Sequence, residues 1–101
     1  MLGSVDAPAG AETALYAPAI NVLASVKVIV ANRTPATALV RVIHRVGTGP
    51  TVAKDFKTFD ELIPGNDSRV SPVFDMENPE ELLVQSNVAG VTFQADGIER
   101  T

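Results

Sequence analysis

Apolar and polar residues alternate with a period of two along much of the chain. Within Val22–Val30 one face is apolar throughout, whereas Ser25 and Lys27 occupy the other face. After a polar turn at Asn32–Pro35, a second run repeats this pattern. The apolar face of the second run carries Ala38, Val40 and Val42, and the opposite face carries Arg41 and Arg45. Strict alternation is typical of half-buried strands, and two β-branched runs joined by a short turn predict an antiparallel hairpin.

The middle of the chain follows the same rule less regularly. A turn around Gly47–Pro50 leads to an apolar stretch at Ala53–Leu62, which predicts a strand. The apolar side of this stretch carries Phe56, Phe59 and Leu62. The spacing of three between the phenylalanines also allows a short helical turn near Val52–Phe56. The sequence Pro-Gly-Asn-Asp at 64–67 predicts a further turn.

The C-terminal third predicts three more strands. Arg69–Phe74 and Glu81–Ser86 have strand character and are separated by an acidic bend at Asp75–Glu80. Val91–Ala95 alternates cleanly, and Gly97 after it marks a bulge or the end of the strand.

The predicted elements together indicate an all-β protein. A short strand at Thr13–Tyr16 brings the total to about seven or eight short strands, with turns spread along the chain. Seven prolines leave few stretches that could form a long helix, because proline disrupts a helix interior. We therefore predict a single antiparallel β-sandwich domain over residues 1–101, with a jelly roll as the candidate topology. Residues 1–11 are predicted to form an extended N-terminal arm.

The amino-acid composition argues against several classes of function. The 101 residues contain no cysteine, which excludes disulfides, thiolate nucleophiles and zinc fingers. The net charge is -4, and only 5% of residues are aromatic, so specific nucleic-acid binding is disfavoured. The most apolar window, Ala19–Ala31, is too short to cross a bilayer, and no membrane role is expected. The first residues lack the features of a secretory signal, so we expect synthesis in the cytoplasm. The N-glycosylation tripeptides at Asn32 and Asn66 are accordingly interpreted as turns.

Charge is distributed unevenly. Residues 13–54 contain five basic residues and no acid, whereas residues 55–101 contain ten acids and three bases. Residues 1–12 add two acids. Strands from these segments could interleave and mix the charges on one surface. Alternatively, the fold could have two oppositely charged faces that favour self-association or docking onto a shell.

Candidate chemistry is sparse. His44, the only histidine, falls on the side of Val40 and Val42 near a strand end. A catalytic or metal-binding role would require carboxylate partners, but the neighbouring sequence supplies arginines, so we interpret His44 as structural. Asp60 and Glu61 are adjacent, so in a strand they point to opposite faces and do not form a carboxylate pair.

The segment Asp75–Glu81 packs four acids into seven residues. Carboxylate-rich loops can bind calcium, which takes six to eight oxygen ligands. However, the segment lacks the Asp-x-Asp-x-Asp-Gly spacing of calcium loops. A solvated turn and a weak cation site both stay open. With no other cluster in the sequence, we expect no catalytic, cofactor-binding or metal-binding residues, no cofactor and no enzymatic activity.

Several short motifs occur together in a recognisable order. The segment Ala9–Ala19 contains Thr-x-Leu-Tyr-x-Pro-Ala, and a valine-rich strand with an Asn-Arg turn follows it. Next come Val-Arg-Val at 40–42, Lys-Asp-Phe at 54–56 and Ile-Pro-Gly-Asn-Asp at 63–67. The chain closes with Val-Thr-Phe-Gln-Ala-Asp-Gly-Ile-Glu at 91–99. This series resembles small β-sandwich virion proteins of tailed bacteriophages. The chain departs from that pattern at Pro79–Glu81, where such proteins often carry a Gly-Asp turn.

The resemblance implies a non-enzymatic structural protein of the virion. We expect a capsid decoration or cement protein that bridges capsomers and contacts the major capsid protein or other virion subunits. It also implies a homo-oligomer, with a trimer as one arrangement. The alternatives are a minor component of the tail, neck or collar and, less in keeping with the sparse aromatics, a receptor- or carbohydrate-binding module.

Overall fold

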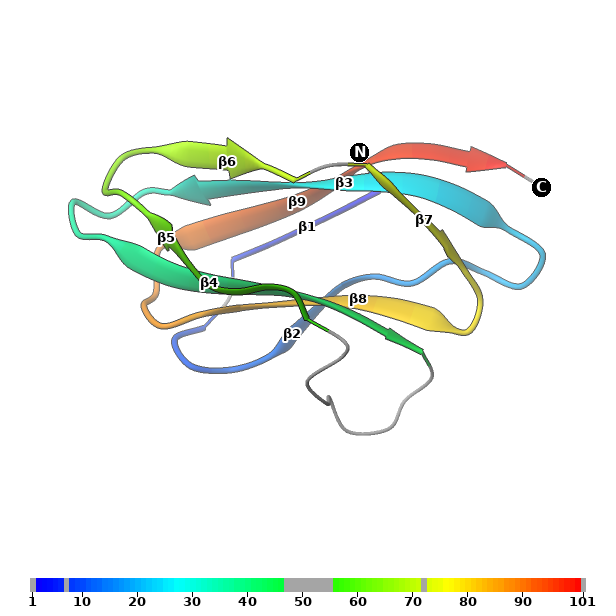
Figure 1. Cartoon of the computed structure of the whole chain (residues 1–101), viewed down its shortest axis with the longest axis horizontal. Helices are drawn as coiled ribbons and strands as arrows, with labels where there is room; N and C mark the ends of the chain where they lie inside the picture. Colours follow the sequence, from blue (N-terminus) through cyan, green and yellow to red (C-terminus); the bar gives the residue numbers. More distant parts are fainter. Residues whose placement is uncertain (1, 7, 47–55, 72, 101) are drawn as a thin grey trace.

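Nine strands and no helix make up the part of the chain that the structure describes (Figure 1). The structure is a computed structural model that describes residues 2–6, 8–46, 56–71 and 73–100, with only the backbone described for 56–60. The strands are β1 (Gly3–Asp6), β2 (Thr13–Tyr16), β3 (Leu23–Asn32), β4 (Ala38–Val46), β5 (Phe56–Ile63), β6 (Ser68–Val70), β7 (Phe74–Glu77), β8 (Glu80–Ser86) and β9 (Val91–Arg100). The predicted all-β class is confirmed. The strands are more numerous than expected, and β3 and β9 each contain ten residues.

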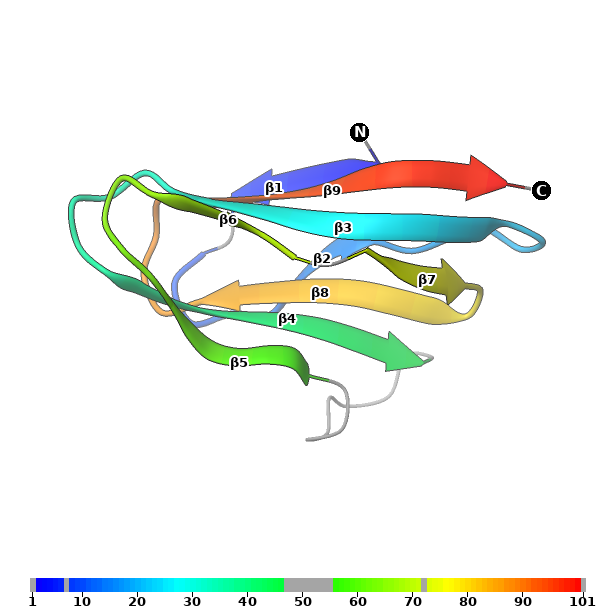
Figure 2. The ribbon, with the colours of Figure 1, turned by 45° about the horizontal axis from the view of Figure 1, so that its top comes forward.

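The strands form two sheets that pack face to face (Figure 2). The first sheet has the order β1-β9-β3, and both β6 and β7 pair with the remaining edge of β3. The second sheet has the order β2-β8-β4-β5. Every pair of named strands is antiparallel. The predicted antiparallel β-sandwich is therefore confirmed.

The strand pairs nest around the middle of the chain. β4 pairs with β5, β3 with β6 and β7, β2 with β8, and β1 with β9. This ribbon of nested pairs is rolled up, so that β3 also lies beside β9 and β4 beside β8. Such a rolled ribbon, divided between two sheets, is a jelly roll.

The predicted hairpin between Val22–Val30 and Ala38–Val42 is wrong. The first run lies in β3 of the first sheet and the second in β4 of the second sheet, and the two strands do not pair. Their buried faces agree with the prediction, since Val28 is 0% and Val40 1% exposed. Residues 33–37 carry the chain from one sheet to the other. The two apolar faces therefore pack against each other across the core instead of lying side by side.

Several predicted boundaries also shift. Asp75–Glu77 belong to β7 rather than to a bend, because Met76 is buried between two outward-facing acids as the strand alternates beside β3. The predicted strand Arg69–Phe74 is divided between β6 and β7. β9 continues through Gly97 to Arg100, with unbroken pairing to β3.

The predicted apolar side of the strand before Pro64 is wrong at Leu62. Leu62 is 61% exposed, whereas Ile63 is fully buried. Glu61 and Ile63 are the register partners of buried residues of β4, so they face inward and Leu62 between them faces outward. The predicted turn at Gly47–Pro50 and residues 52–55 of the alternative helical turn lie outside the described residues, and Phe56 begins β5.

The N-terminal segment predicted as an extended arm contains β1. Residues 3–6 pair with residues 92–95 of β9 and so belong to the first sheet. Leu2 and Val5 pack against the core cluster. Among the described residues, no helix has the length and apolarity to cross a membrane.

Asn32, at the end of β3, holds the crossing between the sheets. Its side chain is buried, and its amide nitrogen donates hydrogen bonds to the carbonyls of Ala36 (2.8 Å) and Ile63 (3.0 Å). Its side-chain oxygen accepts hydrogen bonds from the backbone N–H and the hydroxyl of Thr34, at 3.0 and 2.7 Å. One amide therefore ties the 33–37 crossing to the end of β5. This agrees with the interpretation of Asn32 as a turn residue.

Candidate interaction surfaces

His44 lies near the end of β4, on the side of Val40 and Val42 that faces the other sheet, as predicted. Its Nε2 lies 2.5 Å from Oε1 of Glu80, at the start of β8, and its ring centroid is 5.4 Å from that of Phe74 on β7. This carboxylate comes from a strand 36 residues away and not from the sequence beside His44, which supplies arginines. Together these two contacts tie β4 to β8 and to β7 at the edge of the core.

The four acids of the segment Asp75–Glu81 do not converge. Asp75 accepts a hydrogen bond from the hydroxyl of Ser25 at 2.8 Å, and Glu81 forms an ion pair with Arg45. Glu80 faces the interior toward His44, whereas Glu77 lies on the outer face of the first sheet. In the described part of the chain, no group of three or more His, Cys, Asp or Glu side chains could hold a metal ion.

Basic and acidic strands alternate in space. Lys27 of β3 is the register partner of Asp96 on β9, and Arg45 of β4 that of Glu81 on β8. Another basic residue, Arg33 in the 33–37 crossing, lies 3.2 Å from Asp6 of β1. A hydrogen bond from Thr92, together with the charge of Arg33, lowers the pKa of Asp6. In the described residues these contacts favour mixed charges over two oppositely charged faces.

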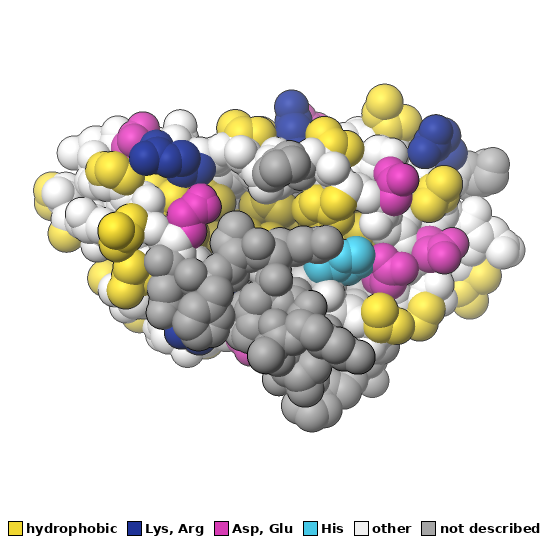
Figure 3. All heavy atoms as spheres, viewed as in Figure 1, with side chains coloured by type: hydrophobic (Ala, Val, Ile, Leu, Met, Phe, Trp, Pro, Cys, Tyr) yellow, Lys and Arg dark blue, Asp and Glu magenta, His cyan; other side chains and the backbone are white. Residues whose placement is uncertain are grey.

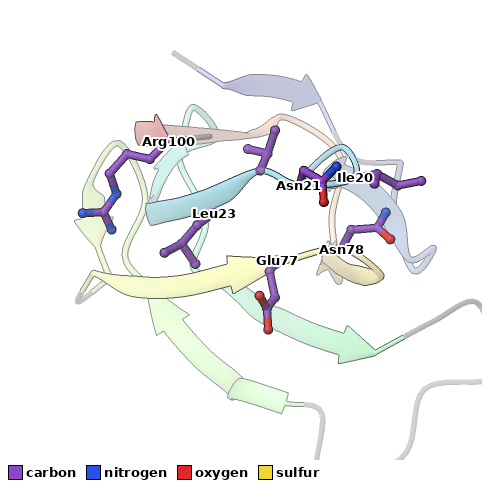
Figure 4. A pocket seen from close by; sticks show the side chains of 7 residues that line it. Ile20, Asn21, Leu23, Glu77, Asn78 and Arg100 are labelled. Atoms are coloured by element: carbon purple, nitrogen blue, oxygen red, sulfur yellow. The ribbon is translucent and has the colours of Figure 1, made fainter.

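An open groove lies at the end of the sandwich where β9 finishes (Figure 4). The cavity measures about 610 Å³ and lies between the loop before β3, the end of β7 and Arg100. Its lining residues are Ile20, Asn21, Val22, Leu23, Glu77, Asn78 and Arg100. We call this site the end groove.

Apolar side chains are unusually exposed at the end groove. Of its lining residues, Ile20 is 74% and Leu23 39% exposed. Beside the groove, Ile98 on β9, whose register partner is Ser25, is 67% exposed. Leu23 is the register partner of both Arg100 and Glu77, so an apolar side chain lies between a base and an acid. Apolar anchors bordered by charges of both signs are typical of protein–protein contacts.

Tyr16 joins the two sheets at the same end of the molecule. Its hydroxyl, at the end of β2, donates a hydrogen bond to Oε2 of Glu99 on β9 at 2.5 Å. Burial, followed by the hydrogen bond and the negative charge of Glu99, raises the pKa of Tyr16 to about 12. The folded protein therefore holds the phenol proton of Tyr16 more tightly than the unfolded chain does. The contribution of this group to stability is fully present below about pH 10 and is lost as the pH rises through about 12.

This shift is directly measurable, since the chain has one tyrosine and no tryptophan. Alkaline titration of the near-ultraviolet absorbance should give a phenolate midpoint near 12 for the folded protein. The Glu99→Gln variant should titrate at lower pH, because the charge is lost while the burial remains. The urea-unfolded chain, with its ordinary tyrosine, serves as the reference. Equal midpoints for the variant and the wild type would contradict the contact.

Among the described residues, no strand covers the side of the sandwich between β5 and β6. Figure 3 shows apolar side chains at the bottom of a hollow on this face, with charged side chains on its rim. A cavity of about 90 Å³ lies here, lined by Val28 and Val30 of β3, Val40 and Val42 of β4, and Glu61, Arg69, Val70 and Ser71. Val70, one of these lining residues, is 59% exposed. We call this site the open side.

Sequence reasoning found neither surface. Ile20 follows Pro18 in a loop, where a single apolar residue gives no signal, and the open side is built from strands that are distant in the sequence. The one available hint was that Val70 and Val73 cannot share a face in an unbroken strand. Comparison with protein-family models, with curated proteins and with solved structures finds no match to this chain.

Proposed function

We propose that the protein is a non-enzymatic structural protein of a bacteriophage virion, a capsid decoration or cement protein that bridges capsomers. The motif order described above supports this proposal. The Thr-x-Leu-Tyr-x-Pro-Ala segment forms β2 and part of the loop that leads to the end groove, and the Asn-Arg turn forms the crossing between the sheets. The closing motif forms most of β9, the strand between β1 and β3.

The exposed apolar side chains in and beside the end groove carry the proposal. Ile20, Leu23 and Ile98 would be covered in a contact with the major capsid protein or another virion subunit, and Glu77 and Arg100 would orient that contact. Burial of such anchors contributes about 25 cal/mol per Å² of apolar surface. A homo-oligomer, with a trimer as one arrangement, would add binding strength by engaging several grooves together. The proposal includes no specific nucleic acid, membrane or cofactor.

The copy number of the protein per purified virion tests the proposal. Quantitative mass spectrometry should give a number comparable to that of the major capsid protein, because a cement protein occupies every equivalent site of the shell. A handful of copies would support the tail, neck or collar alternative instead. Absence from the particles would overturn the virion assignment.

The Ile20→Asp variant tests the role of the end groove. It should fold as the wild type does, because Ile20 is 74% exposed, yet its incorporation into particles should fall at least about tenfold as the anchor is lost. Val46→Asp is the matched control, since Val46 is 68% exposed and does not line the groove. Equal incorporation of the two variants would show that the groove is not the contact.

A further inference from the structure

Within the part of the chain that the structure describes, the open side leaves a strand edge free beside an apolar cavity. β6 lies at one edge of the first sheet and β5 at the facing edge of the second, and no further described strand pairs with either. The valines of β3 and β4 form the wall of the cavity between them. Because a cavity of about 150 Å³ holds benzene, one of about 90 Å³ suits a smaller aliphatic side chain.

The backbone of β6 is oriented to accept another strand. The carbonyl of Asp67 accepts a hydrogen bond from Asn32 N–H at 2.9 Å, and the N–H of Ser71 donates to the carbonyl of Val28 at 2.9 Å. Backbone groups alternate in direction along a strand, so those of Ser68 and Val70 point away from β3. Side chains of Asp67 and Arg69 bind the Ser68 N–H and carbonyl. The backbone groups of Val70 are therefore the ones that an added strand would meet.

Two charged side chains face inward at this side. Glu61 is the register partner of the buried Val40, and Arg69 that of the buried Val30, so both point toward the space between the sheets. Arg69 forms an ion pair with Asp67, in which Nη1 lies 2.6 Å from Oδ2. Glu61 is half-buried, and no described residue forms a hydrogen bond or an ion pair with it. A partly desolvated carboxylate without a partner is costly and favours a basic group beside it.

We propose that the open side binds an extended segment of another protein, which adds to β6 as a strand and places a lysine or arginine beside Glu61. Alternate side chains of that segment point inward, where an aliphatic one fills the valine-lined cavity. The main chain of the segment pairs with the backbone groups of Val70. This is strand addition to a sheet edge, in which backbone hydrogen bonds give affinity and side-chain pockets give specificity. The inference does not depend on the proposed virion function.

The inward charge also explains how such an edge avoids indiscriminate pairing. Inward-pointing charged residues are one way in which sheet edges exclude unwanted strands. A segment without a base would bury Glu61 unpaired, whereas a segment with a base neutralises it. Glu61 therefore selects among strands by penalising the wrong ones.

A synthetic peptide with the sequence Thr-Val-Thr-Lys-Thr-Val-Thr tests the proposal. Its valines and its lysine lie on one face of an extended strand, and its threonines lie on the other. Titration into the full chain should shift the backbone amide signals of Ser68, Val70 and Ser71. A peptide with glutamate in place of the lysine should bind at least about tenfold more weakly.

Variants that change the charge at position 61 of the protein supply the control. The Glu61→Lys variant should lose affinity for the lysine peptide and gain affinity for the glutamate peptide, which also shows that the variant is folded. Glu61→Gln should bind both peptides about equally. Absence of shifts at β6, or equal binding of the two peptides by the wild type, would overturn the proposal. Loss of virion incorporation without loss of peptide binding would bear on the proposed function alone.

Discussion

The Gly97→Ala variant is expected to lose about 3 kcal/mol or more of unfolding free energy, the upper end of the cost of an added carbon atom that its surroundings cannot accommodate. Gly97 lies in β9 opposite Val26 of β3. A Cβ atom at this position would lie 1.9 Å from the carbonyl oxygen of Ser25 and 2.9 Å from its carbon. Both are backbone atoms in a paired strand, so they cannot move aside without breaking the pairing of β3 and β9. Urea unfolding followed by circular dichroism measures the loss.

Gly10→Ala provides the control for this prediction. Gly10 has a φ of +76°, and a Cβ atom there would meet nothing within 4 Å. Its substitution should therefore lower the unfolding free energy only by the cost of holding alanine in a left-handed backbone conformation, about 1–2 kcal/mol. Equal losses for the two variants would show that the close approach of β9 to β3 has no energetic weight.

The second large effect is expected at Asn32, where Asn32→Asp should cost about 3–5 kcal/mol. The aspartate cannot donate to the carbonyls of Ala36 and Ile63, and its charge would face those carbonyl oxygens inside the fold. Asn32→Ala removes the same hydrogen bonds without adding a charge and should cost about 1–3 kcal/mol. The order of stability should therefore be wild type, then alanine, then aspartate, as measured by urea unfolding.

Asn66→Asp is the matched control for the charge. Asn66 is exposed in the turn after β5 and has a φ of 58°, which aspartate also tolerates. The same chemical change there should alter stability by less than about 0.5 kcal/mol. If Asn66→Asp were as costly as Asn32→Asp, the effect would come from the net charge of the protein rather than from the buried hydrogen bonds.

The alternation along β3 and β4 was sufficient to predict which side chains are buried, but not what covers them. The apolar face of a strand is buried by the sheet that packs against it, and this burial is the same whichever strands pair with it in its own sheet. Val28 and Val40 are buried across the core from each other, although the alternation alone suggested neighbouring strands. Neighbour choice depends on the crossing held by Asn32, whose hydrogen-bond acceptors include Ile63, 31 residues away.

The same limit applies to the candidate sites. His44 and Glu80 are 36 residues apart, and only the pairing of β4 with β8 brings them together. Adjacent acids at positions 60 and 61 predict opposite faces, but the face that Glu61 occupies follows from its pairing with the buried Val40 of β4. Turns were easier to predict, because the residues of Pro64–Asp67 are themselves typical of a turn. The positive φ of Asn66 is in keeping with that turn.

The pairing of residues 23–32 with residues 91–100 also has a consequence during synthesis. At translation rates of about 5–20 residues per second, β9 follows β3 by roughly 3–14 seconds. Throughout that interval the first sheet lacks its central strand, and the β-branched run of β3 has at least one unpaired edge. Such runs tend to associate between nascent chains. Lys27 places a positive charge in the middle of this run, where it acts as a gatekeeper against association until β9 arrives.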